Sequence, residues 1–168
     1  MIDEARIQLA LFKELIHRGN YAVIPNISWS WLYWEADLIG ISKAFYMSEY
    51  EIKITKQDFE ADFKKRKHNT LKRENVRNAR IPNYFNYVAP LKAIPLCIPD
   101  YAGLLIVEAD KYGLKISDVK KAPLLHKSKL GTEGVQAMFR SLMFKYWNLA
   151  QTLDTYKIQK QIFNEAKP

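Results

Sequence analysis

The chain has one cysteine among its 168 residues and no long uninterrupted run of apolar residues. A single cysteine, Cys97, can form neither an internal disulfide nor a cysteine cluster for zinc, which agrees with a reducing compartment. Because Cys97 stands in the apolar run 94–98, we expect its side chain to be buried. No apolar stretch reaches the roughly 18 residues of a membrane span, and Asp3 and Glu4 are unlike a secretory signal. These absences predict a protein that stays in the cytoplasm.

The positive charge is unevenly distributed along the chain, although the formal net charge of +8 is moderate. Residues 1–55 hold five Lys or Arg against seven Asp or Glu, whereas residues 56–80 hold nine against four. An acidic segment beside a basic surface is typical of a cation site set in a surface that attracts polyanions. The alternative is a basic protein whose lysines are simply solvated. An apolar fraction of 48% indicates a globular domain with an ordinary core.

Apolar periodicity and turn residues predict a chain that alternates helices with short strands. Asp3 caps a first helix that ends near Arg18, with Ala5, Leu9, Phe12 and Ile16 forming its apolar stripe. Strands are expected at 21–27, where Pro25 favours a sheet edge, and at 35–41, 49–54, 84–89, 103–109 and 114–117. This order predicts an α/β fold with a mixed central sheet flanked by helices.

The strands at 35–41 and 49–54 are joined by a short turn and are expected to form an antiparallel hairpin. Side chains alternate between the two faces of a strand, so Glu51 and Lys53 share one face while Ile52 takes the other. Asp37 can reach that face from the paired strand. Phosphodiester hydrolysis requires carboxylates that bind a hard cation and a lysine near the phosphate. We therefore expect Asp37, Glu51 and Lys53 to converge on one open, solvent-accessible cleft.

A capped basic helix follows the hairpin. Thr55 and Asp58 resemble a capping box for a helix that runs to about Lys67, with Phe59 and Phe63 facing the sheet. The lysines on its other side are expected to face solvent or a phosphate backbone. The stretch 68–82 continues it as a frayed helix or a loop. The residues expected to contact nucleic acid are Lys56, Lys64, Lys65, Lys67, His68, Lys72 and Arg73.

The three histidines share no metal-ligand spacing. His17 lies near a helix end, His68 in the basic stretch and His126 in a predicted loop. We therefore expect surface or capping positions for all three. His68, because it lies in the basic stretch, could also touch a phosphate.

The chain closes with a long amphipathic helix from Thr132 onward, which divides it into a domain at 1–130 and a helical segment at 131–168. We expect this helix to pack on the domain or on a second copy of the chain, which would make a homodimer. The apolar residues that recur at helical spacing are Val135, Phe139, Leu142, Tyr146, Leu149, Leu153 and Tyr156.

The order of elements, an acidic residue on the second strand and Glu-x-Lys on the third resemble the PD-(D/E)XK nuclease superfamily. The run 49–63 is similar to the third motif and following helix of small bacterial and phage members related to MmcB-like DNA repair proteins. The segments 82–90 and 99–104 are similar to the aromatic strand and the tyrosine-glycine segment of that group. The likeness covers about residues 3–120 and implies a restriction-endonuclease-like core.

The resemblance implies a metal-dependent nuclease site. Asp37 and Glu51 would bind Mg²⁺, for which Mn²⁺ would substitute, and the carbonyl of Ile52 would be a further ligand. Lys53 would orient or deprotonate the attacking water, or hold the scissile phosphate. Ala36 stands where the proline of the motif's name would be, and that proline is not a ligand.

The resemblance also implies residues that support the site. Many members add a glutamate from the first helix, for which Glu4 is the better match and Glu14 the competitor. Gln57 would help to position water or DNA.

Three functions follow from these residues. The first is a Mg²⁺-dependent DNA endonuclease of a bacterial cell or a phage-infected host, acting in DNA repair, recombination or genome processing. The second is a nucleic-acid-binding module of the same fold without catalysis. The third is an assembly protein that dimerises through its C-terminal helix.

Overall fold

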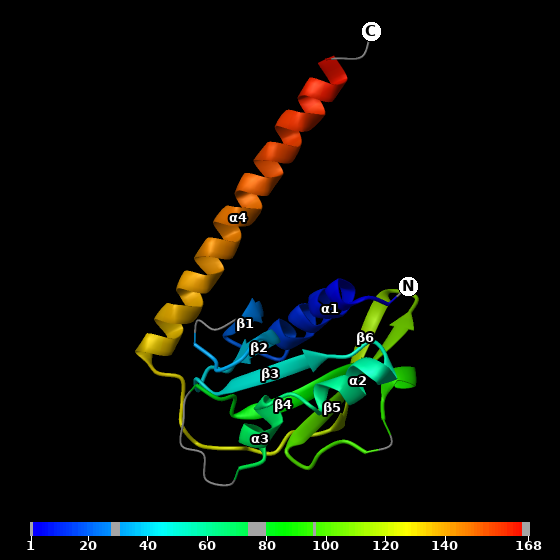
Figure 1. The fold of residues 1–168 in the computed structure, drawn as a ribbon, viewed down its shortest axis with the longest axis vertical. Helices are drawn as coiled ribbons and strands as arrows, with labels where there is room; N and C mark the ends of the chain where they lie inside the picture. Colours follow the sequence, from blue (N-terminus) through cyan, green and yellow to red (C-terminus); the bar gives the residue numbers. More distant parts are fainter. Residues whose placement is uncertain (1, 28–30, 74–79, 96, 166–168) are drawn as a thin grey trace.

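The computed structural model describes residues 2–27, 31–73, 80–95 and 97–165. Part of the predicted frayed helix or loop, residues 74–79, therefore lies outside the described residues. The elements follow one another as α1 (Glu4–His17), β1 (Ala22–Ile27), β2 (Ala36–Ile41), β3 (Met47–Ile52), α2 (Lys56–Asp62), α3 (Lys67–Leu71), β4 (Tyr84–Pro90), the 3₁₀ helix η1 (Leu91–Ala93), β5 (Ala102–Asp110), β6 (Gly113–Lys120) and α4 (Thr132–Glu165) (Figure 1).

The six strands form one mixed sheet whose spatial order, β1 to β6, follows the chain. Strands β1, β2 and β3 pair antiparallel, so the predicted hairpin is confirmed. Strands β3, β4 and β5 run parallel, with α2 and α3 in the first crossover, and β6 adds an antiparallel edge. Pro25 lies on edge strand β1, the kind of strand to which proline is largely confined within sheets. The predicted α/β fold with a mixed sheet flanked by helices is confirmed.

Helix α1 covers one face of the sheet and begins as predicted, because Asp3 Oδ1 accepts from the Arg6 amide at 2.9 Å. The predicted apolar stripe is wrong, however. The side chains that pack on the sheet are Ile7, Leu11 and Leu15, against Leu38, Tyr50, Ile52 and Val88, whereas Leu9, Phe12 and Ile16 are exposed. Both stripes are apolar, and docking on the sheet selects the one that is buried.

Helices α2 and α3 cover the opposite face. Their apolar residues Phe59 and Leu71 pack with Phe85 and Tyr87 of β4. The expected single helix to Lys67 is instead interrupted between α2 and α3. This turn brings both helices against the same strands and directs polar side chains of both toward β3.

Two expectations about single residues are also wrong. Cys97 is exposed, since its run lies in an irregular segment outside the sheet. His126 is buried and takes part in holding the segment before α4 against the sheet, where its Nε2 lies 2.9 Å from the Ile81 carbonyl. Asn83 completes this anchor: its amide donates to the His126 carbonyl, and its own oxygen accepts from the Met47 amide.

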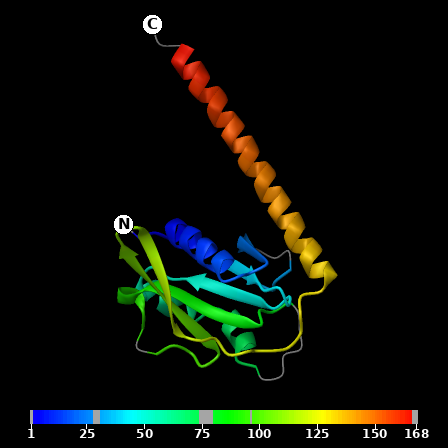
Figure 2. The same cartoon turned by 180° about the vertical axis from the view of Figure 1, so that it is seen from behind.

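The first turns of α4 pack on the β1–β2 edge, where Met138 is buried among Ile24, Ile27 and Ile39. The remainder of α4 projects away from the domain (Figures 1 and 2). No helix within the described ranges is both long and apolar enough to span a membrane.

Candidate metal and nucleic-acid site

The candidate site begins where β2 and β3 separate. Their backbone pairing ends at Leu38 with Tyr50, although β2 starts at Ala36 and β3 continues to Ile52. At this opening the Asp37 carboxylate accepts a hydrogen bond from the Ile52 amide at 2.7 Å. Continuing the register by one step sets Asp37 opposite Glu51, and directly opposite residues lie on the same face of a sheet.

Helix α1 reaches the same opening through its first turns. Gln8 donates to the Asp37 carbonyl at 3.2 Å and lies 3.4 Å from Glu4 Oε1. Glu14 points elsewhere, since it pairs with Arg18 at 2.7 Å near the far end of α1. The structure thus brings Glu4 near Asp37 and leaves Glu14 away from it.

Burial and a neighbouring negative charge raise the pKa of the Asp37 carboxyl. Desolvation and the nearby Glu51 carboxylate raise the pKa of Asp37 from 3.8 to about 6, against the lowering effects of the Ile52 amide and of Lys53. Glu4 adds a smaller raising effect. A carboxyl with such a pKa is a place where a bound cation would relieve repulsion.

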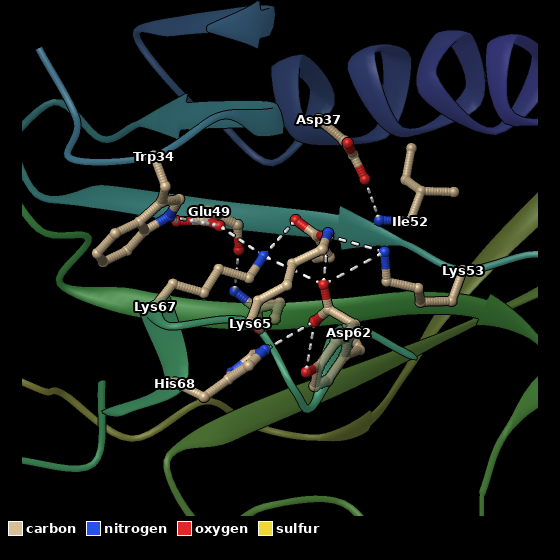
Figure 3. A network of polar contacts seen from close by, with 12 residues as sticks. Trp34, Asp37, Glu49, Ile52, Lys53, Asp62, Lys65, Lys67 and His68 are labelled. Atoms are coloured by element: carbon tan, nitrogen blue, oxygen red, sulfur yellow. Dashed lines mark hydrogen bonds and ion pairs between the residues drawn. The ribbon is translucent and has the colours of Figure 1, made fainter. Parts of the chain in front are cut away.

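Glu51 and Lys53 share one face, as predicted, but they are buried rather than solvent-accessible, with 2% and 5% of their side chains exposed. Their charged atoms are 2.8 Å apart. Lys65 and Lys67 also reach Glu51, at 3.1 Å from Oε1 and 2.7 Å from Oε2 (Figure 3). Both oxygens of the expected metal ligand therefore contact ammonium groups, because α2 and α3 close over this part of the sheet.

Asp62 is the centre of the contacts from the helix side. It is 1% exposed and accepts from the Tyr87 hydroxyl at 2.9 Å, while His68 Nε2 lies 2.9 Å away (Figure 3). Lys65 pairs with it at 2.7 Å. Despite burial, its hydrogen bond to His68 and the charge of Lys67 hold the pKa of Asp62 well below its usual range. Asp62 therefore remains ionised.

Glu49 extends the same face of β3 by one alternation and is fully buried. Trp34 Nε1 donates to its carboxylate at 2.8 Å, and Lys67 Nζ is 3.5 Å from Oε1. Burial is the largest effect and raises the pKa of Glu49, which Lys67 opposes and Glu51 reinforces. We call Glu49, Glu51, Asp62, Lys53, Lys65 and Lys67 the buried charge cluster.

The structure divides the predicted nucleic-acid residues into two groups. Lys67 and His68 are buried, so the prediction that they face solvent or phosphate is wrong: the turn after α2 directs them into the charge cluster. The other residues predicted to contact nucleic acid are exposed: Lys56, Lys64, Lys65, Lys72 and Arg73. Gln57 is exposed on the first turn of α2.

Glu49, Asp62 and Trp34 were not among the predicted site residues, although two of them left a signal in the sequence. Glu49 precedes Glu51 by two positions, which gives one strand face the pattern Glu-x-Glu-x-Lys. Asp62 lies three residues after Phe59, on the helix side that faces the sheet. Trp34 has no comparable signal, because its contact with Glu49 depends on how the loop before β2 folds.

Within the ranges that the structure describes, no three His, Cys, Asp or Glu side chains form a group that could hold a metal ion. A metal at the β2–β3 opening would thus rely on the Asp37 and Glu51 carboxylates together with a backbone oxygen such as that of Ile52. That donor set is the type that Mg²⁺ prefers, so it fits in chemistry. A bound metal would have to displace ammonium groups from both Glu51 oxygens, because Lys53 and Lys65 contact Oε1 and Lys67 contacts Oε2. Lys65 is the most accessible of the three, with 54% of its side chain exposed, and its ammonium also pairs with Asp62 at 2.7 Å.

Comparison with known proteins supports the fold alone. The sequence matches no family model, and no curated protein matches it. Among solved structures, the chain is similar to SPO1766, a protein of unknown function from Silicibacter pomeroyi, with a TM-score of 0.61 and 17% identity over 94% of each chain. The shared architecture therefore includes nearly the whole chain, whereas an identity this low carries no information about activity.

Proposed function

We propose that the protein is a metal-dependent endonuclease that hydrolyses phosphodiester bonds of DNA in repair, recombination or genome processing. The observation that carries this proposal is the Asp37 carboxylate at the β2–β3 opening, in register with Glu51 and near Lys53. It is also the arrangement that the resemblance to PD-(D/E)XK nucleases implies.

Asp37, Glu51 and the Ile52 carbonyl would hold Mg²⁺ or Mn²⁺, and the bound ion would polarise the phosphate and supply an activated water. Lys53 would orient that water or stabilise charge on the phosphate, and its ammonium, 2.8 Å from Glu51, supports this role. Glu4 supports the site through Gln8, which links it to the strand that carries Asp37.

Exposed basic residues of α2, of the turn after it and of the end of α3 would hold the DNA backbone. Lys64 lies in the turn, and Lys72 and Arg73 follow α3. Their side chains are exposed, and Lys65, which follows Lys64 in the same turn, would be a further phosphate contact because 54% of its side chain is accessible. A phosphate that bound the Lys65 ammonium would remove one of the ammonium groups that contact Glu51. The contacts of Glu51 with Lys53 and Lys67 would remain for the metal to displace.

A second candidate is a nucleic-acid-binding module without catalysis. The observation that favours it is Lys67, whose side chain is 3% exposed and lies 2.7 Å from Glu51 Oε2 and 3.5 Å from Glu49 Oε1. A buried ammonium in this position neutralises the carboxylates without any ion. In that case Lys65 and Lys67 would be permanent partners of Glu51.

The decisive experiment combines cleavage with metal titration. The purified protein is incubated with labelled linear, nicked, flapped and four-way DNAs in Mg²⁺, Mn²⁺ or EDTA, and metal binding is measured by calorimetry. For the endonuclease we expect metal-dependent cleavage that Asp37→Asn and Glu51→Gln abolish while DNA binding survives. Glu60→Gln, on the exposed side of α2, is the matched control and should keep wild-type activity.

Two results distinguish the alternatives. DNA binding without cleavage or metal uptake, in the wild type and in Lys65→Gln, would replace the endonuclease by the binding module. Cleavage that persists in Asp37→Asn or Glu51→Gln would place the catalytic site elsewhere in the protein.

A further inference from the structure

The outer part of α4 presents a long apolar surface to solvent. Its first turns are anchored to the domain: Met138 is buried, and the Lys145 ammonium donates to the Pro25 and Asn26 carbonyls. Beyond Lys145 the helix extends away from the sheet in both views (Figures 1 and 2). Residues 146–165 alone correspond to roughly 30 Å of helix at about 1.5 Å per residue.

Two series of apolar residues in α4 follow a heptad repeat, while other exposed apolar residues, such as Phe144, Trp147 and Ile158, lie outside it. One series recurs every seven residues, at Val135, Leu142, Leu149, Tyr156 and Phe163, and the second stands four residues after members of the first, at Phe139, Tyr146 and Leu153. These are the d and a positions of a coiled coil, and the repeat lasts about four heptads. In the outer part the seam is exposed: 64% for Tyr146, 59% for Leu149, 51% for Leu153 and 62% for Tyr156.

We propose that residues 146–165 of α4 form an antiparallel two-helix coiled coil with the same segment of a second copy of this chain. A repeat of seven keeps the seam facing another helix along its whole length, which a flat protein surface does not require. The segment carries two lysines, Lys157 and Lys160, and two acids, Asp154 and Glu165, so charge does not oppose self-association. It also lacks the basic face that a nucleic acid or an anionic membrane would need.

Lys160 determines the orientation. It occupies the last a position of the seam, so a parallel pair in register would set Lys160 against Lys160 of the other copy. An antiparallel overlap of the outer segments instead sets Leu149 opposite Lys160 and Leu153 opposite Tyr156, which alternates a and d positions across the seam. The lysine stem then covers Leu149 while its ammonium reaches solvent. This overlap also keeps the two domains at opposite ends of the helix pair.

The size of the seam sets the expected affinity. A fully buried aromatic side chain removes about 150–250 Å² from solvent, and Tyr146 and Tyr156 enter with more than half of their surfaces exposed. With the leucines, the pair would bury on the order of 1,000 Å² in total, at the lower limit of specific interfaces. We therefore expect a dissociation constant of roughly micromolar order.

Sedimentation velocity of the full chain across the micromolar range tests the association. We expect a monomer–dimer equilibrium that Leu153→Asp shifts to monomer, with at least a tenfold weaker association. Gln151→Asp is the matched control, because it adds the same charge to an exposed side chain outside the a and d positions of the same helix. Circular dichroism verifies that both variants retain their helix.

Cysteine cross-linking tests the orientation in a Cys97→Ser background. When Leu149→Cys and Lys160→Cys proteins are mixed and oxidised, we expect the mixed 149–160 disulfide to predominate. A 149–149 disulfide as the main product would overturn the antiparallel pairing. A monomer at all concentrations, or a dimer equally sensitive to Leu153→Asp and Gln151→Asp, would overturn the interface itself.

Discussion

Asp62→Asn tests whether the buried charge cluster stabilises this fold. The substitution keeps the size of the side chain but removes the charge that the Lys65 ammonium contacts at 2.7 Å and that lies 3.6 Å from both Lys53 and Lys67. Removing one partner from a buried ion pair typically costs about 3–5 kcal/mol, because the remaining charges are left buried without compensation. We expect a loss of that order, which is a large part of the roughly 5–15 kcal/mol of a typical domain.

The measurement is equilibrium denaturation by urea at pH 7, monitored by tryptophan fluorescence, since Trp34 is buried against Glu49. The midpoint of thermal unfolding should fall by roughly 10 °C for a chain of this size. Asp58→Asn is the control: this carboxylate also lies near Lys53, at 3.8 Å, but 49% of its side chain is exposed, so we expect a loss of less than about 0.5 kcal/mol.

The pH dependence gives an independent check. The pKa of Asp62 is lower in the folded than in the unfolded protein, so its contribution is complete above about pH 4 and is lost as the pH falls further. The difference between wild type and Asp62→Asn should therefore shrink below about pH 4. A loss at pH 7 no greater than that of Asp58→Asn would refute the stabilising role of the cluster.

Three further predictions address other parts of the molecule. Asp37→Asn should stabilise the protein by roughly 1–3 kcal/mol at pH 7 and should have no effect on stability at about pH 4. The reason is that burial raises the pKa of Asp37 to about 6 in the folded protein, so the wild type loses stability as the pH rises from 4 to 6. Equal urea midpoints for the two proteins at pH 7 would contradict this. Replacing Lys64, Lys72 and Arg73 by Gln should lower the slope of log affinity for DNA against log salt by up to about three, measured by fluorescence anisotropy, whereas an unchanged slope would show that these residues are only solvated. Gly103→Ala should strongly destabilise or unfold the domain, because the added Cβ would lie 2.7 Å from the backbone nitrogen of Ala122, in the segment after β6. Thermal unfolding measures this, and a wild-type melting temperature would show that the segment moves aside.

The sequence by itself determined the hairpin and most of the elements, although not the break between α2 and α3, because these features depend on local signals. Asp3 and Thr55 cap their helices as expected, and alternation alone placed Glu51 of β3 and Lys53, just after the strand, on the same face of the sheet. The a and d positions of α4 are likewise readable as a repeat. For these features the physical cause lies within a few residues of chain, so no knowledge of the tertiary structure is needed.

Only the tertiary structure decided which polar groups are solvated. Lys67 has the sequence surroundings of a surface lysine, yet the turn between α2 and α3 directs it into the sheet beside Glu51. The choice between the two apolar stripes of α1 had the same origin, since burial is set by the partner surface rather than by the helix. Local periodicity defines faces, but long-range packing selects the face that leaves water, and with it the charges that must be paired inside the protein.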